Sequence, residues 1–349
     1  MMRAAIALVI ALAGSARADD DLAGASVVFQ RGQALIKTDA RGRGEAELAR
    51  LPEHAVVRAL RTDAAGKVLL ADVGGAWSWM PLDGSGALAE LPCGDGPAQL
   101  AEDGAAVLCR GKQRGSLVIT LATGKVTALD IPPAGARLAG GKLVWADERG
   151  VWIAPPGDVK AATRAADAPL RGFLASPDGA RAVGVYAGEV YTDAHHKKAA
   201  ELLFGFALDG AGARRKAIKD GVAVEWSHDA AWVLVQDGAS ACIMKATGGE
   251  YKCWKGYTAA SIASDGKFAL VLGNRDGSRR LAPATAKKKA DPDEAADEGQ
   301  TEATPDVAVA PPTGPLALYR VRLEGSAYTE PPVLVARVVD GAAVWVPAP

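Results

Sequence analysis

The sequence predicts an all-β fold built from repeated four-stranded sheets. The first observation is a recurring turn signal whose second residues lie 38, 37, 38, 51 and 36 positions apart. The six turns are Ala65-Gly66, Asp103-Gly104, Gly140-Gly141, Asp178-Gly179, Asp229-Ala230 and Asp265-Gly266. The second observation is a short apolar run after each turn, as in Lys67-Val68-Leu69-Leu70. A period near forty residues made of short strands is typical of a β-propeller, in which each repeat is one sheet, or blade.

The composition agrees with this class. The chain has 349 residues, enough for several blades of about 40 residues each and a large buried core. Forty glycines and twenty prolines with only 5% aromatic residues fit a protein rich in turns and small side chains. The formal net charge of −1 gives no electrostatic attraction to nucleic acid, so no nucleic-acid partner is expected.

The N-terminal residues 1–18 have the pattern of a cleaved signal peptide. Met1-Met2-Arg3 forms a short positive region, an apolar run extends from Ala4 to Gly14, and Ala16-Arg17-Ala18 matches a cleavage site. The apolar run is too short to span a bilayer. We therefore expect export, with residues 19–349 forming a single propeller domain without a membrane span in the periplasm or outside the cell. The alternative is a buried N-terminal helix.

The four cysteines fit an oxidising compartment. Cys242 and Cys253 flank a turn at residues 247–249 symmetrically, which places them across a hairpin, where a disulfide can form. Cys93 and Cys109 bracket another hairpin. Four cysteines allow three pairings, of which we favour Cys93–Cys109 and Cys242–Cys253. A metal site on these cysteines is disfavoured, since no Cys-x-x-Cys occurs and the pairs lie far apart in the sequence.

The repeats divide the chain into blades in order. Blade 2 is expected at about 53–92, blade 3 at 93–131, blade 4 at 132–169, blade 5 at 170–221 and blade 6 at 222–258. Residues 26–52 supply only the three outer strands of blade 1. Residues 268–271, 316–321 and 333–336 supply strands b, c and d of blade 7. The strand left over, 343–346, is expected as the innermost strand of blade 1, which closes the ring and removes exposed sheet edges.

This division gives seven blades, with eight as the alternative. From Gly266 to Gly341 is 75 residues, or about two periods, so two blades could be drawn there. Much of that stretch lacks strand-like patterning, which favours one blade with an insertion.

One repeat carries a recognisable motif. The run Ser176-Pro177-Asp178-Gly179 resembles the Ser-Pro-Asp-Gly signature of TolB-like and WD-like propeller repeats, and Ser264-Asp265-Gly266 and Trp226-Ser227-His228-Asp229 are weaker copies. The resemblance covers most of the mature chain by period and only blade 5 by close motif. It implies the propeller fold and, for many relatives, a binding role in the envelope or outside the cell. No recurring Gly-His or Trp-Asp pair of true WD repeats is present.

Two insertions interrupt the period, and both fall between the second and third strands of a blade. Both should therefore project from the same face of the disc, which is our candidate working surface. The first, in blade 5, is expected to be a long hairpin. Near its tip Asp193, His195 and His196 could bind a metal, although adjacent strand residues point to opposite sides and a solvated polar tip is the simpler interpretation.

The second insertion, at about 284–314, is acidic, with seven acids against three lysines and no aromatic residue. Because its composition offers no core, we expect a disordered loop inside a folded blade. It is either a tolerated spacer or a tether for a basic partner.

Catalytic motifs are missing from the sequence. We find no Gly-x-Ser-x-Gly elbow and no phosphate loop, and the chain has only four histidines, one of which is His228 in the first turn of blade 6. We assign no catalytic residue and expect no cofactor. The eight tryptophans mostly lie in expected strands, where they should pack between blades; a carbohydrate platform is the alternative.

Three functions follow as hypotheses. The first is a monomeric, exported, non-catalytic module that binds a protein or ligand in the cell envelope, with a protein partner expected. The second is a propeller hydrolase or lyase with a site at the channel mouth. The third is a structural subunit of an envelope complex. Clustered ionisable side chains on the b–c face near the axis would favour the enzyme, whereas an apolar or mixed polar patch without perturbed titrating groups would favour binding.

Overall fold

The protein is described by a computed structural model that covers residues 22–112, 115–129, 137–147, 149–156, 158–166, 171–191, 197–208, 215–219, 221–246, 251–274, 316–323 and 331–348. Within these ranges the regular structure is β-strand, apart from one three-residue 3₁₀ helix, η1 (Val159–Ala161). The all-β propeller predicted from the sequence is confirmed. In the described part of the chain no helix has the length and apolar character to cross a membrane.

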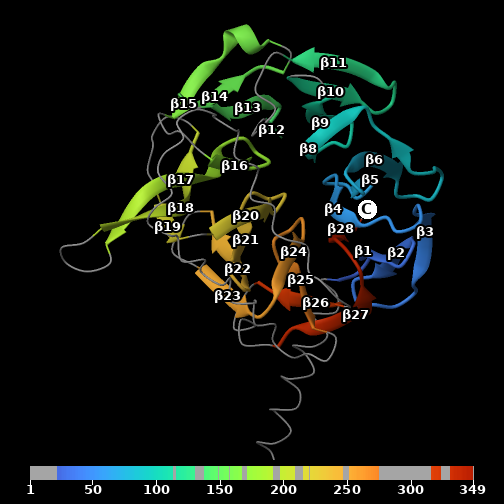
Figure 1. Ribbon diagram of the computed structural model, residues 1–349. Coiled ribbons are helices and arrows are strands. Elements are labelled where there is room, and N and C mark those ends of the chain that lie inside the picture. Colours follow the sequence, from blue (N-terminus) through green and yellow to red (C-terminus); the bar gives the residue numbers. More distant parts are fainter. Residues whose placement is uncertain are drawn as a thin grey trace, which may run out of the picture.

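The described strands form seven four-stranded antiparallel sheets arranged around an axis (Figure 1). We number the sheets as blades 1–7 in chain order and name their strands a to d from the axis outward. Blade 1 holds β28 (Ala343–Val346), β1 (Ser26–Arg31), β2 (Ala34–Asp39) and β3 (Ala46–Arg50). Blade 2 holds β4 (Val57–Thr62), β5 (Val68–Val73), β6 (Ala76–Pro81) and β7 (Ala89–Glu90). Blade 3 holds β8 (Cys93–Leu100), β9 (Ala106–Gly111), β10 (Ser116–Thr120) and β11 (Lys125–Leu129).

The remaining blades follow the same order. Blade 4 holds β12 (Arg137–Ala139), β13 (Lys142–Asp147), β14 (Gly150–Ala154) and β15 (Thr163–Ala166). Blade 5 holds β16 (Arg171–Ala175), β17 (Arg181–Tyr191), β18 (Lys197–Ala207) and β19 (Arg215–Lys219). Blade 6 holds β20 (Gly221–Trp226), β21 (Trp232–Asp237), β22 (Ser240–Lys245) and β23 (Tyr251–Lys255). Blade 7 holds β24 (Thr258–Ile262), β25 (Phe268–Asn274), β26 (Leu316–Arg322) and β27 (Val333–Val339).

The C-terminal strand closes the ring as predicted. β28 pairs antiparallel with β1, with Val344 opposite Val28. Each innermost strand also contacts the innermost strands of its two neighbouring blades, so that β4, β8, β12, β16, β20, β24 and β28 form an unbroken cycle around the axis. Strands from both ends of the described chain therefore belong to one sheet, and β28 covers the inner edge of β1.

Apolar side chains fill the spaces between neighbouring blades. A separate buried cluster lies between each adjacent pair of the described sheets, including one between blades 7 and 1 and one between blades 1 and 2. The second strands are buried on both faces, as in β21, whereas outer strands such as β11 are mostly exposed. This difference explains why the second strands show the continuous apolar runs that marked the repeat in the sequence. Six tryptophans are buried in these layers, which confirms their expected packing role for Trp77, Trp145, Trp226, Trp232, Trp254 and Trp345.

The turns between strands a and b share one hydrogen-bonding pattern. In blade 5, the Asp178 carboxylate accepts from the Ser176 hydroxyl and from the backbone N–H of Ala180. The same serine–aspartate pattern recurs in blade 6, where Ala230 occupies the position of Gly179 with φ of 54°. Side-chain oxygens of Ser and Asp hold such turns by bonding the backbone two residues on, and φ above zero is the reason that glycine usually follows.

Side-chain amides link neighbouring blades. Gln30 of β1 is 3% exposed, and its Oε1 accepts from the N–H of Val57 in blade 2 at 2.7 Å. Gln236 of β21 repeats this contact with the N–H of Ala259 in blade 7 at 2.8 Å. Gln99 of β8 forms two bonds with the backbone of Leu138 in blade 4. Each amide satisfies backbone groups that the sheet pairing leaves over, so these residues fix the spacing between blades.

Both predicted cysteine pairs are bonded. The sulfur atoms of Cys93 and Cys109 lie 2.08 Å apart and link β8 to β9, the first and second strands of blade 3. Those of Cys242 and Cys253 lie 2.12 Å apart, between residues that face each other directly across β22 and β23. Among the described cysteines none is free.

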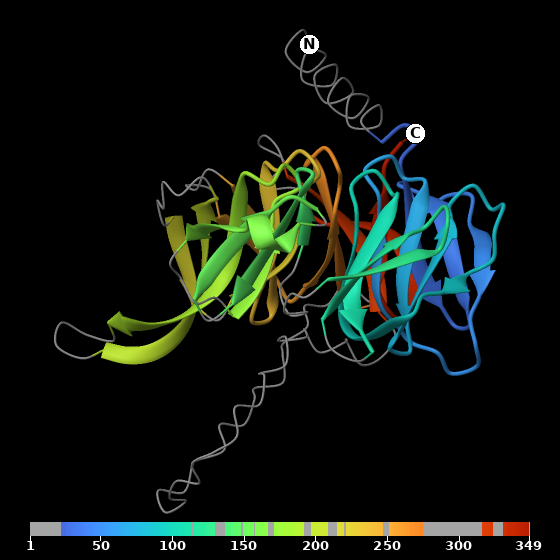
Figure 2. The same cartoon turned by 90° about the horizontal axis from the view of Figure 1, so that it is seen from above.

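The blade 5 insertion forms the long hairpin that the sequence predicted. β17 and β18 stay in register from Arg181↔Ala207 to Tyr191↔Lys197 and project beyond the disc, on the side opposite the end of β28 (Figure 2). The candidate metal ligands Asp193, His195 and His196 lie outside the described residues, as do the signal peptide and the acidic insertion.

The two strands on either side of the second insertion are paired as far as their ends. β25 and β26 pair in unbroken register as far as Asn274↔Leu316. Because these two residues lie one strand spacing apart, a two- to four-residue turn can join them, and loop closure entropy changes only with the logarithm of loop length. We expect that replacing residues 284–312 with a short glycine turn changes the melting temperature by no more than a few degrees in circular dichroism. Loss of cooperative unfolding would show that the segment packs against the disc.

Candidate functional site: the axial pocket

A pocket lies on the axis of the ring, at the end where strands a turn into strands b. Its lining comes from the innermost strands of five consecutive blades, 2 to 6, and from the turns that follow them. Its cavity volume is about 80 Å³. The lining residues are Arg61, Thr62, Pro97, Ala98, Gln99, Leu100, Glu102, Arg137, Leu174, Ala175, Pro177, Val224, Glu225, Trp226 and His228.

The walls of this axial pocket combine apolar and polar side chains, and the apolar part comes from three blades. Leu100 and Trp226 are buried, with 6% of each residue exposed, and alanines of β8 and β16 complete the same surface. The Trp226 indole N–H donates to the Leu174 carbonyl at 3.0 Å, which fixes the ring against the neighbouring blade. A concave, apolar surface with a few convergent charged groups is the usual form of a ligand site.

A pair of charged side chains crosses the pocket. His228, in the a–b turn of blade 6, contacts through Nδ1 the carboxylate of Glu102, in the a–b turn of blade 3. The two residues are 126 positions apart in sequence, and blades 3 and 6 are not neighbours in the ring. The contact therefore connects opposite sides of the channel mouth.

The surroundings of His228 favour its protonated form. Burial lowers the pKa of the imidazole, but the hydrogen bond with Glu102 and the negative charges of Glu102, Glu225 and Asp63 outweigh burial and raise the pKa above its usual value. Asp63 is itself 1% exposed and holds the a–b turn of blade 2 by accepting from the N–H groups of Lys67 and Val68.

Glu225, at the end of β20, is the second titratable group of the pocket. Burial raises the pKa of its carboxyl, and the nearby Arg61 charge and two hydrogen bonds oppose that shift. The two bonds reach the next blade: Oε2 accepts from the Ser261 hydroxyl and from the Ile262 N–H, each at 2.8 Å. This carboxylate is therefore part of the contact between blades 6 and 7 as well as part of the pocket wall.

We expect the contact between His228 and Glu102 to appear in a pH titration. Because the folded pKa of His228 lies above its unfolded value, the contact stabilises the fold fully below the unfolded pKa, and this contribution is lost as pH rises through the folded pKa. The variant Glu102→Gln should lower the pKa of His228 seen by NMR. Its deficit in urea unfolding against the wild type should be largest near pH 6 and vanish at alkaline pH. A deficit independent of pH would contradict this assignment.

The pocket lies on the face opposite to the working surface expected from the sequence, and that expectation stays a prediction. The two insertions pointed to the face that carries the b–c connections, whereas the titratable cluster lies at the a–b end of the axis. Glu102 and His228 stand at turn positions, where polar residues are ordinary, and so gave no distinct signal. His228 was placed correctly in the blade 6 turn, but its partner across the ring could not be identified from spacing.

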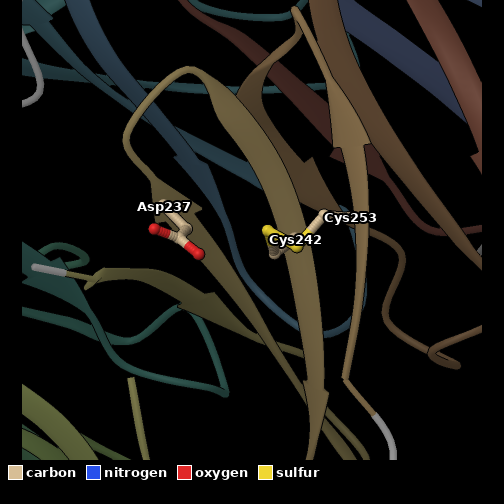
Figure 3. A group of neighbouring side chains, drawn as sticks. All are labelled: Asp237, Cys242 and Cys253. Atoms are coloured by element: carbon tan, nitrogen blue, oxygen red, sulfur yellow. A yellow bond between two sulfur atoms is a disulfide. The ribbon is translucent and has the colours of Figure 1, made fainter. Parts of the chain in front are cut away.

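A separate group of possible metal ligands lies beside a disulfide in blade 6. Ligand atoms of Asp237, Cys242 and Cys253 come within 4.8 Å of one another (Figure 3). Both sulfur atoms are joined in the disulfide, so no thiolate is offered to a metal in the oxidised protein. Asp237 instead accepts a hydrogen bond from the Tyr251 hydroxyl at 2.8 Å. Burial, together with that bond, raises the pKa of Tyr251.

Comparison with known proteins gives a likeness in fold alone. No protein-family model matches the chain, and no curated protein sequence matches it. Among solved structures, a TolB from Agrobacterium tumefaciens is 10% identical, with 92% of this chain and 97% of that chain covered and a TM-score of 0.46. The dihydro-heme d1 dehydrogenase NirN in complex with DHE is 15% identical, with 92% and 74% covered and a TM-score of 0.48.

Proposed function

We propose that this protein is an exported, non-catalytic propeller that binds a ligand or protein partner in the cell envelope, at the axial pocket. The observation that carries the proposal is the convergence of five blades on one cavity that combines apolar walls with charged groups. The two disulfides support an oxidising compartment.

The engagement of the pocket's titratable groups favours binding over catalysis. A general base must be free to reach a proton of its substrate. Here Glu225 is bonded to Ser261 and Ile262, and His228 is paired with Glu102. These groups hold three blades in fixed positions and present a preorganised surface, which suits recognition.

Co-purification tests the proposal. The protein is isolated from its own cells under native conditions, and molecules that denaturation releases, small or protein, are identified by mass spectrometry. We expect Arg61→Ala to lose a molecule that the wild type retains. The matched control is Arg58→Ala, because Arg58 lies on the same strand but is exposed and does not line the pocket. Equal retention by both variants would remove the pocket from the function.

The alternative of a hydrolase or lyase rests on one observation, the raised pKa of the Glu225 carboxyl, since a carboxyl that stays protonated can act as a general acid. A panel of chromogenic esters and glycosides tests it. Turnover that Glu225→Gln abolishes would favour the enzyme, whereas absence of turnover throughout the panel favours binding. The third candidate, a structural envelope subunit, predicts that removal of residues 284–314 abolishes a native complex while pocket variants leave it intact.

A further inference from the structure

The polar groups of the axial pocket differ in how much of their hydrogen-bonding capacity is already used within the protein. The Gln99 amide is bonded at both ends to Leu138, and the Thr62 hydroxyl donates to the Trp345 carbonyl at 3.0 Å. The Trp226 N–H and the Glu102–His228 pair are likewise engaged. These groups have little capacity left for a ligand.

Arg61 differs from these groups. It stands near the end of β4, is partly buried and lines the pocket, yet among the described residues its guanidinium forms no hydrogen bond or ion pair within contact distance. Its influence on Glu225 is through charge alone. A guanidinium carries five N–H donors in a planar fork, and a partly buried one that leaves them unused is poorly compensated.

The charges around Arg61 largely offset one another, so its unused N–H donors set it apart rather than a net positive charge. Glu102 is matched by His228, whose protonated form is favoured, and the Arg61 charge acts on the Glu225 carboxyl. Arg137, from β12 of blade 4, also lines the pocket and has interactions of its own. A ligand group with two acceptor oxygens in one plane would use the donors that Arg61 leaves unused among the described residues.

We propose that the axial pocket recognises a carboxylate attached to an apolar body, with the carboxylate held by the Arg61 guanidinium and the body packed on Leu100, Leu174 and Trp226. This inference rests on the proposed binding function and specifies its ligand class. A carboxylate matches the guanidinium fork through two parallel N–H···O bonds. A doubly charged phosphate would face the neighbouring carboxylates of Glu102 and Glu225 at greater cost.

A titration with three matched probes tests the inference on the full mature chain. Benzoate, benzamide and benzylammonium share one ring and differ in charge. The readout is the indole N–H resonance of Trp226, assigned by its loss in Trp226→Phe. We expect saturable shifts with benzoate and no shift with benzylammonium. Benzamide should bind about tenfold or more weakly than benzoate, because charge-assisted hydrogen bonds to the guanidinium contribute free energy of that size.

Two variants locate the carboxylate. Arg61→Ala should weaken benzoate by about tenfold or more and leave benzamide nearly unchanged, whereas Arg58→Ala should change neither. If Arg61→Ala folds poorly, Arg61→Lys is measured in its place, because lysine retains the positive charge but lacks the planar guanidinium that binds both carboxylate oxygens. Equal binding of benzoate and benzamide, preference for benzylammonium, or no shift with any probe would overturn the inference. A native ligand that Arg61→Ala fails to retain would still support the binding site itself, so the two proposals fail separately.

Discussion

Gly140→Ala should destabilise the protein by about 2–5 kcal/mol, far more than the same change at the next residue. Gly140 stands in the a–b turn of blade 4 with φ of 55°, and its N–H donates to the Pro177 carbonyl of blade 5 at 2.7 Å. A Cβ there would overlap the backbone carbonyl of Asp178. The left-handed backbone and the clash add, and the backbone of the neighbouring turn cannot yield without breaking that turn.

Gly141→Ala is the matched control for this prediction. Gly141 also has a positive φ, of 69°, but no atom lies within 4 Å of an added Cβ. Only the cost of the left-handed backbone applies there, about 1 kcal/mol. Urea unfolding followed by tryptophan fluorescence measures both variants. Similar midpoints for the two would mean that the turns of blades 4 and 5 do not interlock as the structure places them.

Removal of the C-terminal strand should abolish cooperative unfolding. All four residues of β28 are buried, and the strand belongs to the clusters on both sides of blade 1. Its Trp345 stacks on Phe268 of blade 7 at 5.8 Å and accepts through its carbonyl from Thr62 of blade 2. A chain ending before Ala343 would therefore lose contacts to three blades and expose the inner edge of β1.

A single substitution in β28 tests the same contacts with a smaller expected effect. Trp345→Ala should cost about 3–5 kcal/mol, the range for deletion of a large buried aromatic side chain. Trp152→Ala is the control, because Trp152 is partly exposed at the rim of blade 4, beside Arg149. A truncated chain that unfolds at the temperature of the full chain would contradict closure of the ring by β28.

The fold was accessible from the sequence because its signals are local and repeated. The turn at Asp229-Ala230 was identified although alanine replaces glycine there, and the cysteine pairs followed from their positions about hairpins. Closure by residues 343–346 followed from counting strands, since one strand was missing at the start and one was left over at the end.

The candidate site was harder to predict from the sequence, because its residues come together only in the closed ring of blades. Glu102 and His228 come from turns in blades 3 and 6, and Glu225 binds Ser261 of the next blade. No spacing relates such residues, and each has an ordinary local role. The two insertions are the clearest departures from the repeat period in the sequence, and the strand order predicts them on the opposite face of the disc.

Site-specific photo-crosslinking in the native cells tests most directly whether the a–b end of the axis is the working surface. A photoreactive phenylalanine analogue is placed singly at Pro97 or Pro177, which line the pocket, and at Tyr191 or Lys197, which end the paired part of the β17–β18 hairpin. We expect crosslinked products from the two pocket positions, which Arg61→Ala abolishes and Arg58→Ala retains. Products from the hairpin positions alone would contradict this expectation and restore the opposite face as the binding surface.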